Sequence, residues 1–156
     1  MSDERSPADV RAFLDHHGLA VQELNADTST AQTAAHALQT SVGSIAKSLL
    51  FIAANEPVLV VASGDTRVDQ VKLASFLGTD AVRLAKPKEV VALTGYRVGG
   101  VPPVAHAHQL RVLMDRALFD YPTVYADAGS PLAIFPVEPV VLQSISGAEL
   151  VDVTEG

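Results

Sequence analysis

The sequence predicts an α+β fold, a single compact domain over residues 1–156 in which helices surround a mixed β-sheet. Helix and strand patterns alternate in the first half of the chain, whereas strand patterns cluster in the second half. Hydrophobic residues make up 48% of the chain, but only 5% of the residues are aromatic and tryptophan is absent. The chain is therefore long enough to bury a core, which Val, Leu, Ile and Ala must build.

Five helices are expected, because caps or prolines start most of them and glycines end them. The first begins at Ser6-Pro7-Ala8-Asp9, where Ser6 is the N-cap, Pro7 is the first helical residue and Asp9 lies in the first turn. The other four begin after Ser29 or Thr30, after Asp65 or Thr66, at Pro87 and at Val137. The glycines that can end these helices are Gly18, Gly78, Gly95 and Gly147.

Seven strands are expected between and after these helices, each a short apolar or β-branched run. They cover residues 21–24, the stretch from the turn at Gly43 through Ile52, and residues 57–62, 82–84, 110–114, 123–126 and 132–135. Residues 57–62 are apolar at every position, which indicates a central strand covered on both faces.

Composition excludes several classes of protein. The net charge of −7 argues against a protein that coats DNA or other nucleic acid non-specifically. Cysteine is absent, which excludes disulfides, thiolate metal sites and a cysteine nucleophile and fits a cytoplasmic protein. The N-terminus is polar and no uncharged apolar run approaches the length of a membrane span, so we expect neither a signal peptide nor a membrane segment.

Charge is unevenly distributed along the chain. Residues 67–97 contain six basic and three acidic residues, whereas residues 117–156 contain six acidic residues and no basic one. A local basic face could therefore meet a phosphate chain. The alternative is a set of charges scattered over solvated helices.

Lys47 is the first candidate functional residue, because it lies between Ile45 and the apolar run Leu49-Leu50-Phe51. Lysine is almost never buried without a partner, so its ammonium is expected to point into a cavity that brings it an anion. There it could bind a phosphate or carboxylate, or stabilise a developing oxyanion. The alternative is a lysine whose head reaches water along the sheet. Ser48 would lie on the opposite face of a strand, so only one of the two can face the pocket, and we favour Lys47.

The loop Gly99-Gly100-Val101-Pro102-Pro103 is the second candidate. Adjacent glycines can present free backbone N–H groups in an anion-binding concavity, and two prolines reduce the entropy cost of keeping it open. A plain turn is the alternative. The segment Ala128-Gly129-Ser130-Pro131 is the third candidate, a turn that could bring Ser130 to a pocket rim, although the residues alone favour a plain structural turn.

No metal site or catalytic triad is predicted. The five histidines have neither cysteine partners nor the spacing of a His-Glu-x-x-His site, and His106, just past the loop, is expected at the pocket rim. Gly-x-Ser-x-Gly is absent, which leaves no argument for a Ser–His–Asp order. Gly43-Ser44 before Lys47 lacks the second glycine of a phosphate-binding loop.

In this order the motifs resemble the YbaK/ProX family of aminoacyl-tRNA editing domains, which is related to the insertion domain of bacterial prolyl-tRNA synthetase. The resemblance covers most of the chain, from about Thr30 to Val151. It rests on residues 33–38, Ile45–Phe51, Leu73–Phe76, Arg83–Ala85, Thr94–Pro103, Ala128–Pro131 and the final helix and strand. It implies a YbaK-like fold, with a mostly antiparallel, barrel-like sheet surrounded by helices.

The resemblance implies hydrolysis in trans of the ester of mischarged aminoacyl-tRNA, with tRNA-Pro carrying a small amino acid as one candidate substrate. The implied partner is the acceptor end of the tRNA, and an aminoacyl-tRNA synthetase is a candidate second partner. The resemblance implies no cofactor, metal or membrane. Lys47 matches the family's essential lysine, and Gly99 and Gly100 belong to its catalytic Gly-x-x-x-Pro loop. The implied substrate-binding residues are Val101, Pro102, Pro103, His106, Gly129 and Ser130.

Members of this family generally have no protein nucleophile, and the terminal ribose hydroxyl of the tRNA and an ordered water contribute to ester cleavage. We therefore expect Lys47 to bind the phosphate of the terminal nucleotide and the loop amides to face the ester carbonyl. Two residues depart from the family pattern. Pro102 replaces a small hydroxyl residue of some members, and Ala105-His106 follows the prolines where many members have a glycine. The amino acid that is cleaved therefore stays open.

Two other functions remain open as well. The chain could be a non-catalytic domain of the same fold that binds a nucleotide, an aminoacyl-tRNA or a synthetase as an accessory factor. Such a domain could also retain Lys47 and the loop. It could instead hydrolyse another small acyl or nucleotide ester, in which case it would be active without tRNA.

Overall fold

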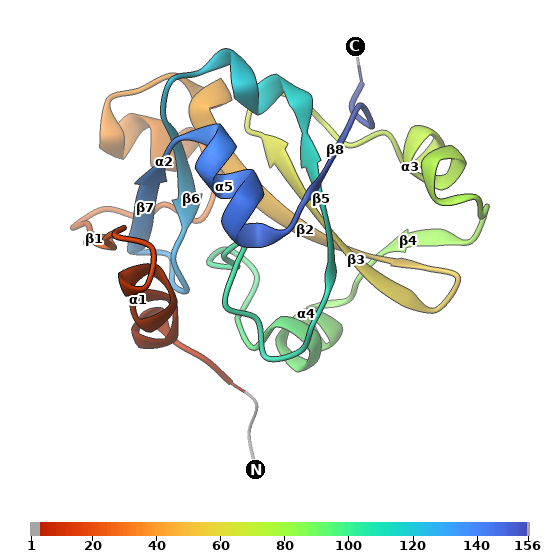
Figure 1. Ribbon diagram of the computed structural model, residues 1–156, viewed down its shortest axis with the longest axis horizontal. Coiled ribbons are helices and arrows are strands. Elements are labelled where there is room, and N and C mark those ends of the chain that lie inside the picture. Colours follow the sequence, from red (N-terminus) through yellow and green to blue (C-terminus); the bar gives the residue numbers. More distant parts are fainter. Residues whose placement is uncertain (1–3, 156) are drawn as a thin grey trace.

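A mixed sheet of eight strands organises the fold, and five α-helices pack around it in the computed structural model, which describes residues 4–155 (Figure 1). The helices are α1 (Pro7–Asp15), α2 (Ala31–Leu38), α3 (Gln70–Leu77), α4 (Pro87–Thr94) and α5 (Pro139–Ser146). The strands are β1 (Gln22–Glu23), β2 (Ile45–Ala53), β3 (Glu56–Ser63), β4 (Val82–Leu84), β5 (Arg111–Asp115), β6 (Val124–Asp127), β7 (Ala133–Val137) and β8 (Glu149–Val151). Two 3₁₀-helices, η1 (Val42–Ser44) and η2 (Arg116–Asp120), precede β2 and β6. The predicted α+β class is confirmed.

Three helices begin where the sequence predicts, because their capping groups or prolines are in place. The Ser6 hydroxyl accepts a hydrogen bond from the N–H of Ala8, and the Asp9 carboxylate accepts one from the N–H of Ser6, which completes a capping box for α1. Thr30 caps α2 by accepting from the backbone of the third helical residue, and Pro87 is the first residue of α4.

The expected starts of the other two helices are wrong. The cap of α3 is Asp69, whose carboxylate accepts hydrogen bonds from the first turn, whereas Asp65 accepts from the hydroxyl of Ser63 in the preceding turn. Val137 is still extended and pairs with Val124, so α5 begins only at Pro139. The chain before α3 is held by a β-bridge between Val68 and Thr154, so in both cases a tertiary partner overrides a local helix signal.

The strand order is β1-β7-β6-β2-β3-β5-β8, and β4 pairs with β2 beside this path. Four strand pairs are antiparallel (β1–β7, β2–β3, β2–β4 and β6–β7) and three are parallel (β2–β6, β3–β5 and β5–β8). Within residues 4–155 the two end strands, β1 and β8, do not pair, so the sheet is open and the barrel-like closure expected from the family is not observed. β3 is buried from Val58 to Ser63, which confirms the predicted central strand.

Different strands pair with β2 along its length, and the gap between them is where the candidate site lies. On one side β3 pairs with β2 from Ala46 to Ala53. On the other side β6 pairs with Ile45 and Ala46, and β4 pairs only from Phe51 onward. Within residues 4–155, the segment between these pairings, residues 47–50, therefore has no strand beside it on that edge.

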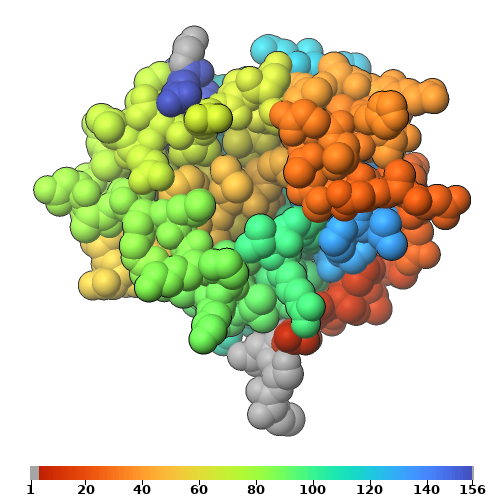
Figure 2. Space-filling view, turned by 180° about the vertical axis from the view of Figure 1, so that it is seen from behind, coloured from red at the N-terminus to blue at the C-terminus, as the bar shows by residue number. Residues whose placement is uncertain are grey.

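Side chains alternate between the two faces of β2. Ala46, Leu50 and Ile52 belong to the largest core cluster, which also contains residues of α1, α4 and α5. Ile45 packs with α2, and Phe51 packs with the α3 side of the molecule. In Figure 1 α5 lies in front of the sheet, and in Figure 2, seen from behind, the orange α2 segment is in front instead. None of the helices in the described part of the chain has the length and apolar character that a membrane crossing requires.

Candidate active site

A cavity of about 250 Å³ opens at the unpaired edge of β2. Its walls come from five segments: the start of α2, residues 47–50 of β2, the β4–α4 region, the loop that contains Gly99 and the end of β6. In the space-filling view of this face the tan atoms of β2 are visible in a hollow between the orange α2 segment, the green β4–α4 region and the teal loop (Figure 2). Most of the lining is apolar, and the polar lining residues are Ser29, Thr30, Lys47, Ser48 and Asp127.

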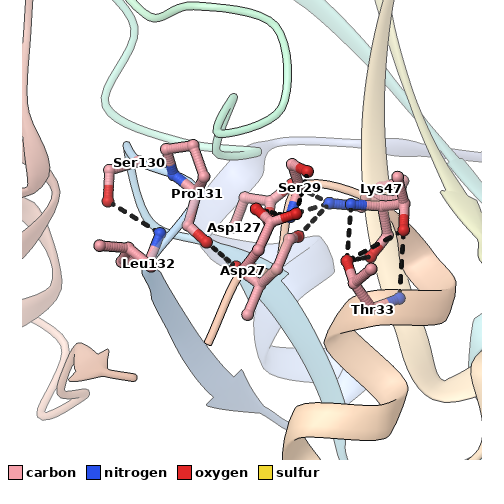
Figure 3. Close-up of polar contacts among 10 residues, drawn as sticks. Asp27, Ser29, Thr33, Lys47, Asp127, Ser130, Pro131 and Leu132 are labelled. Carbon is pink, nitrogen blue, oxygen red and sulfur yellow. Dashed lines mark hydrogen bonds and ion pairs between the residues drawn. The ribbon is translucent and has the colours of Figure 1, made fainter. Parts of the chain in front are cut away.

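Lys47 reaches from β2 toward the end of β6, where its ammonium meets a carboxylate (Figure 3). Its Nζ lies 2.8 and 3.1 Å from the two carboxylate oxygens of Asp127 and 2.9 Å from the carbonyl oxygen of Thr28. The parallel pairing of Ala46 with Ala126 places the next residue of each strand, Lys47 and Asp127, side by side. The anion predicted beside Lys47 therefore exists, but it belongs to the protein.

The Lys47–Asp127 pair is buried, with side-chain exposures of 16% and 5%. Burial raises the pKa of the Asp127 carboxyl to about 7, and the adjacent Lys47 charge opposes this rise. The two charges compensate each other when both groups are ionised, so the pair adds no net charge to the cavity. The expected binding of a phosphate by Lys47 would require this compensation to be broken.

The two glycines of the loop differ in what they offer to a ligand. Gly99 lines the cavity with φ of +98°, and a Cβ there would lie 3.2 Å from the Cβ of Ser29. The N–H of Gly100 instead donates to the carbonyl of Arg97 at 3.1 Å, and its own carbonyl accepts from the N–H of Gly129 at 2.9 Å. Two adjacent free amides were expected, and for Gly100 that expectation is wrong, because its amide closes a turn.

Beyond the glycines, the loop is fixed by buried contacts. Val101 lines the cavity, whereas Pro102 and Pro103 are buried and absent from the lining. The ring of His106 lies 2.7 Å from the Pro102 carbonyl, and burial lowers the pKa of His106, so the neutral ring donates its Nε2–H to that carbonyl. His106 does not line this cavity, and its hydrogen bond to the Pro102 carbonyl holds the loop in place.

Ala105 has a backbone conformation that favours glycine. Its φ is +62°, a left-handed conformation that costs an alanine about 1–2 kcal/mol. The Ala105 carbonyl accepts a hydrogen bond from the hydroxyl of the buried Tyr96 at 2.7 Å and another from the guanidinium of Arg5 at 3.2 Å. These contacts maintain a conformation that glycine would adopt without strain.

Gly129 and Ser130 support the loop and do not line the cavity of Lys47. Both line a neighbouring hollow together with Gly100. A Cβ on Gly100 would lie 2.7 Å from the Cα of Ser130, so the two turns pack backbone to backbone. The Ser130 hydroxyl accepts a hydrogen bond from the N–H of Leu132 at 3.2 Å (Figure 3).

Two lining residues were missed or set aside by sequence reasoning. Asp127 was missed, although it is a lone acid between Ala126 and Ala128 in an apolar strand, directly before a turn that was noted. Ser48 was set aside because its side chain alternates with that of Lys47. Both residues line the cavity, since it opens at the edge of β2 and is reached from both faces. Among residues 4–155, no group of three or more metal-ligating side chains is positioned to share an ion.

Comparison with known proteins identifies relatives of this chain. The model of the aminoacyl-tRNA editing domain family matches residues 25–145. YwhH, an uncharacterized protein of Bacillus subtilis, is 35% identical over 127 residues, which are 81% of this chain and 80% of that protein. The proline–tRNA ligase of Nitratidesulfovibrio vulgaris is 41% identical over 81 residues, which are 52% of this chain but only 14% of the ligase.

Solved structures agree over nearly the whole chain. A protein proposed to be a trans-editing enzyme for prolyl-tRNA synthetase matches with a TM-score of 0.91 and 40% identity, over 98% of this chain and 99% of that one. A hypothetical protein matches with a TM-score of 0.87 and 34% identity, over 94% of this chain and 99% of its own length.

Proposed function

The chain belongs to the aminoacyl-tRNA editing domain family, and from this premise we propose that it is a trans-acting deacylase that hydrolyses the ester of mischarged aminoacyl-tRNA. The observation that carries the proposal is the buried Lys47–Asp127 pair at the edge of an apolar cavity. The relatives support tRNA-Pro as the tRNA that is accepted, because they include a proline–tRNA ligase and a protein proposed to edit for prolyl-tRNA synthetase.

Lys47 acts on the ester carbonyl in this proposal. Its N–H groups are aimed by Asp127 and the Thr28 carbonyl, and a substrate carbonyl would replace one of these acceptors. The backbone amide of Gly99 is the proposed second donor, since Gly99 lines the same cavity. One donor directed at a developing oxyanion contributes about 10²–10³ in rate. Asp127 is the positioning residue, so activity should fall below about pH 7, where its carboxyl takes up a proton.

The attacking group comes from the substrate or from water. The chain has no cysteine, and no histidine lines the cavity in residues 4–155. The lining hydroxyl of Ser29 donates to the exposed carboxylate of Asp27 at 2.8 Å, and a carboxylate is a weaker base than the histidine that activates a serine nucleophile. The terminal ribose hydroxyl of the tRNA, or a water that it orients, is therefore the proposed nucleophile.

The remaining predicted site residues shape the cavity. Val101 forms its wall, and Pro102 and Pro103 stiffen the loop behind it. His106 holds the loop through its hydrogen bond to the Pro102 carbonyl. Gly129 and Ser130 support Gly100, because the two turns pack backbone to backbone. Of this set, Val101 is the one proposed to touch the aminoacyl group directly.

The acceptor end of the tRNA is the proposed partner outside the cavity. A groove next to it is lined by two basic residues, Lys88 and Arg97, and one acidic residue, Glu4, and Val98 belongs to both the groove and the cavity. Two cations beside the mouth suit the phosphates of a short single strand, whereas the acidic remainder of the chain would repel a longer helix. A synthetase that delivers the tRNA is compatible with this geometry.

Deacylation of tRNA-Pro charged with Ala, Cys, Ser, Thr or Pro tests the proposal. Release of the amino acid should be rapid for one or two of the mischarged forms and slow for Pro-tRNA-Pro. Lys47→Ala and Asp127→Asn should each lower kcat/KM by at least about 100-fold. The matched control is Lys72→Ala, because Lys72 also donates to a backbone carbonyl, that of Thr154, but lies on α3 outside the cavity.

Two results would reject the deacylase. Absence of release above the buffer rate for every charged tRNA would leave a binding domain of the same fold, which filter binding of aminoacyl-tRNA would then detect. Full activity in Lys47→Ala would show that the cavity is not where the ester is cleaved.

A further inference from the structure

The buried hydroxyl of Ser48 has no hydrogen-bond partner within the described residues. Its Oγ is the one buried side-chain nitrogen or oxygen atom in the described part of the chain that makes no hydrogen bond. A buried hydroxyl without a partner costs about 1–3 kcal/mol, and most such groups in proteins are satisfied. Two other buried serines follow this rule, because Ser44 donates to the carbonyl of Ser41 and Ser63 donates to that of Gly43.

Ser48 also lies where a ligand can reach it. It lines the cavity, and within residues 4–155 no strand pairs with its outer edge. Backbone groups alternate in direction along a strand, and the carbonyl of Leu50 points outward to accept from the N–H of Ala85 at 2.9 Å. The N–H and carbonyl of Ser48, two residues earlier, therefore point outward as well. The hydroxyl, the backbone N–H and the carbonyl of Ser48 are therefore all available at the same unpaired edge of β2.

The surroundings of Ser48 indicate which part of a substrate it meets. Its side chain shares a face of β2 with Ala46 and Leu50, and Val90 and Val101 line the same cavity. The charged pair Lys47–Asp127 lies on the other face. A substrate whose ester lies at the charged pair would extend its amino-acid side chain toward the apolar part of the cavity, where Ser48 supplies the polar atom.

We propose that the Ser48 hydroxyl hydrogen-bonds the hydroxyl of a small amino-acid side chain, so that the chain cleaves Ser-tRNA or Thr-tRNA in preference to Ala-tRNA. The inference rests on the proposed deacylase function and names its substrate class. An alanyl group leaves the Ser48 hydroxyl unpaired, whereas a seryl or threonyl group satisfies it. One neutral hydrogen bond of this kind corresponds to a preference of about tenfold in kcat/KM.

The test compares kcat/KM for tRNA-Pro charged with Ser, Thr or Ala in the wild type and in Ser48→Ala. The wild type should prefer Ser and Thr over Ala by about tenfold, and the variant should lose this preference mainly through slower cleavage of the two hydroxyl substrates. Its melting temperature should not fall, because the substitution removes an unsatisfied hydroxyl. Ser48→Cys, which is close in size, should show the same loss of preference.

Ser44→Ala is the matched control, a buried serine outside the cavity whose hydroxyl is already bonded. It should lower the melting temperature by about 2–4 °C and leave the ratio of Ser to Ala cleavage unchanged. A wild type that cleaves the panel with the same preferences as Ser48→Ala and Ser48→Cys would overturn the role of Ser48 and leave the deacylase intact. A wild type that cleaves none of the three would overturn this inference, and it would reject the deacylase as well only if Cys-tRNA-Pro is also left intact.

Discussion

Replacement of Lys47 by methionine is expected to destabilise the protein by an amount that grows with pH. In the wild type, burial raises the pKa of Asp127 to about 7, from a value near 3.8 in an unfolded chain, while the Lys47 charge limits the rise. Without that charge the carboxyl, whose side chain is 5% exposed, should keep its proton throughout pH 6–9. Both unfolded chains are already deprotonated throughout this range, so above pH 7 only the variant must take up a proton in order to fold.

The magnitude follows from the pKa of the wild-type carboxyl. Each pH unit well above it adds about 1.4 kcal/mol to the cost of the substitution. The pH-dependent part is therefore below about 0.5 kcal/mol at pH 7, about 1.4 kcal/mol at pH 8 and about 2.7 kcal/mol at pH 9. A constant part of about 1 kcal/mol comes from the lost hydrogen bond to the Thr28 carbonyl.

Urea unfolding followed by circular dichroism at each pH from 6 to 9 gives the free energies of unfolding. Lys72→Met is the control, because Lys72 donates to the carbonyl of Thr154 and makes no ion pair in the described residues, so its cost should not vary with pH. In an Asp127→Asn background the pH dependence of Lys47→Met should vanish. A cost that stays flat from pH 6 to 9, or an equal slope in the asparagine background, would refute the coupling of Lys47 to Asp127.

Three further predictions concern the loop beside the cavity. Gly100→Ala should lower the free energy of unfolding by about 2–3 kcal/mol in urea titrations, because the new Cβ would lie 2.7 Å from the backbone of Ser130; Gly78→Ala, which meets open space, should cost only about 1 kcal/mol. Ala105→Gly should raise the melting temperature by about 2–4 °C by relieving the φ of +62°, and a lower value would contradict the strain. Burial lowers the pKa of His106, so the stability that the neutral ring contributes is present above pH 6.5 and is lost as pH falls below it. His106→Gln should remove this loss of stability at acidic pH. An unchanged dependence of the free energy of unfolding on pH would contradict the role of His106 in holding the loop.

Local signals in the sequence were enough to predict most of the fold. Ser6, Thr30 and Pro87 start helices whose caps need only a few residues, and such short-range geometry can be recognised without the rest of the chain. The predicted start of α3 at Asp65 or Thr66 was wrong because the chain before Asp69 pairs with the C-terminal segment. Val68 forms a β-bridge with Thr154 there, and the N–H of Asp69 donates to the carbonyl of Val153.

The candidate site was predicted less completely, because it depends on which strands become neighbours. Lys47 was identified from its apolar surroundings, but its partner Asp127 is 80 residues away and is brought beside it by the parallel pairing of β2 with β6. The same limit applies to Ser48. Alternation along a strand excludes it from a pocket that lies on the Lys47 face, but not from a cavity that opens at an edge. The sequence does not show where an edge is left unpaired.

The compensated charge of Lys47 bears on how an acidic protein can select one ester among many phosphate compounds. A free lysine in the cavity would attract the phosphates of any nucleotide, whereas the Asp127 carboxylate cancels that attraction and leaves a directed N–H donor. In an apolar cavity such a donor stabilises a developing oxyanion more strongly than it would in water. In the proposed function, attraction of phosphates is then left to Lys88 and Arg97 outside the mouth. The separation of these two tasks would allow the aminoacyl group, through its contact with Ser48 in the proposed site, to decide which substrate is cleaved.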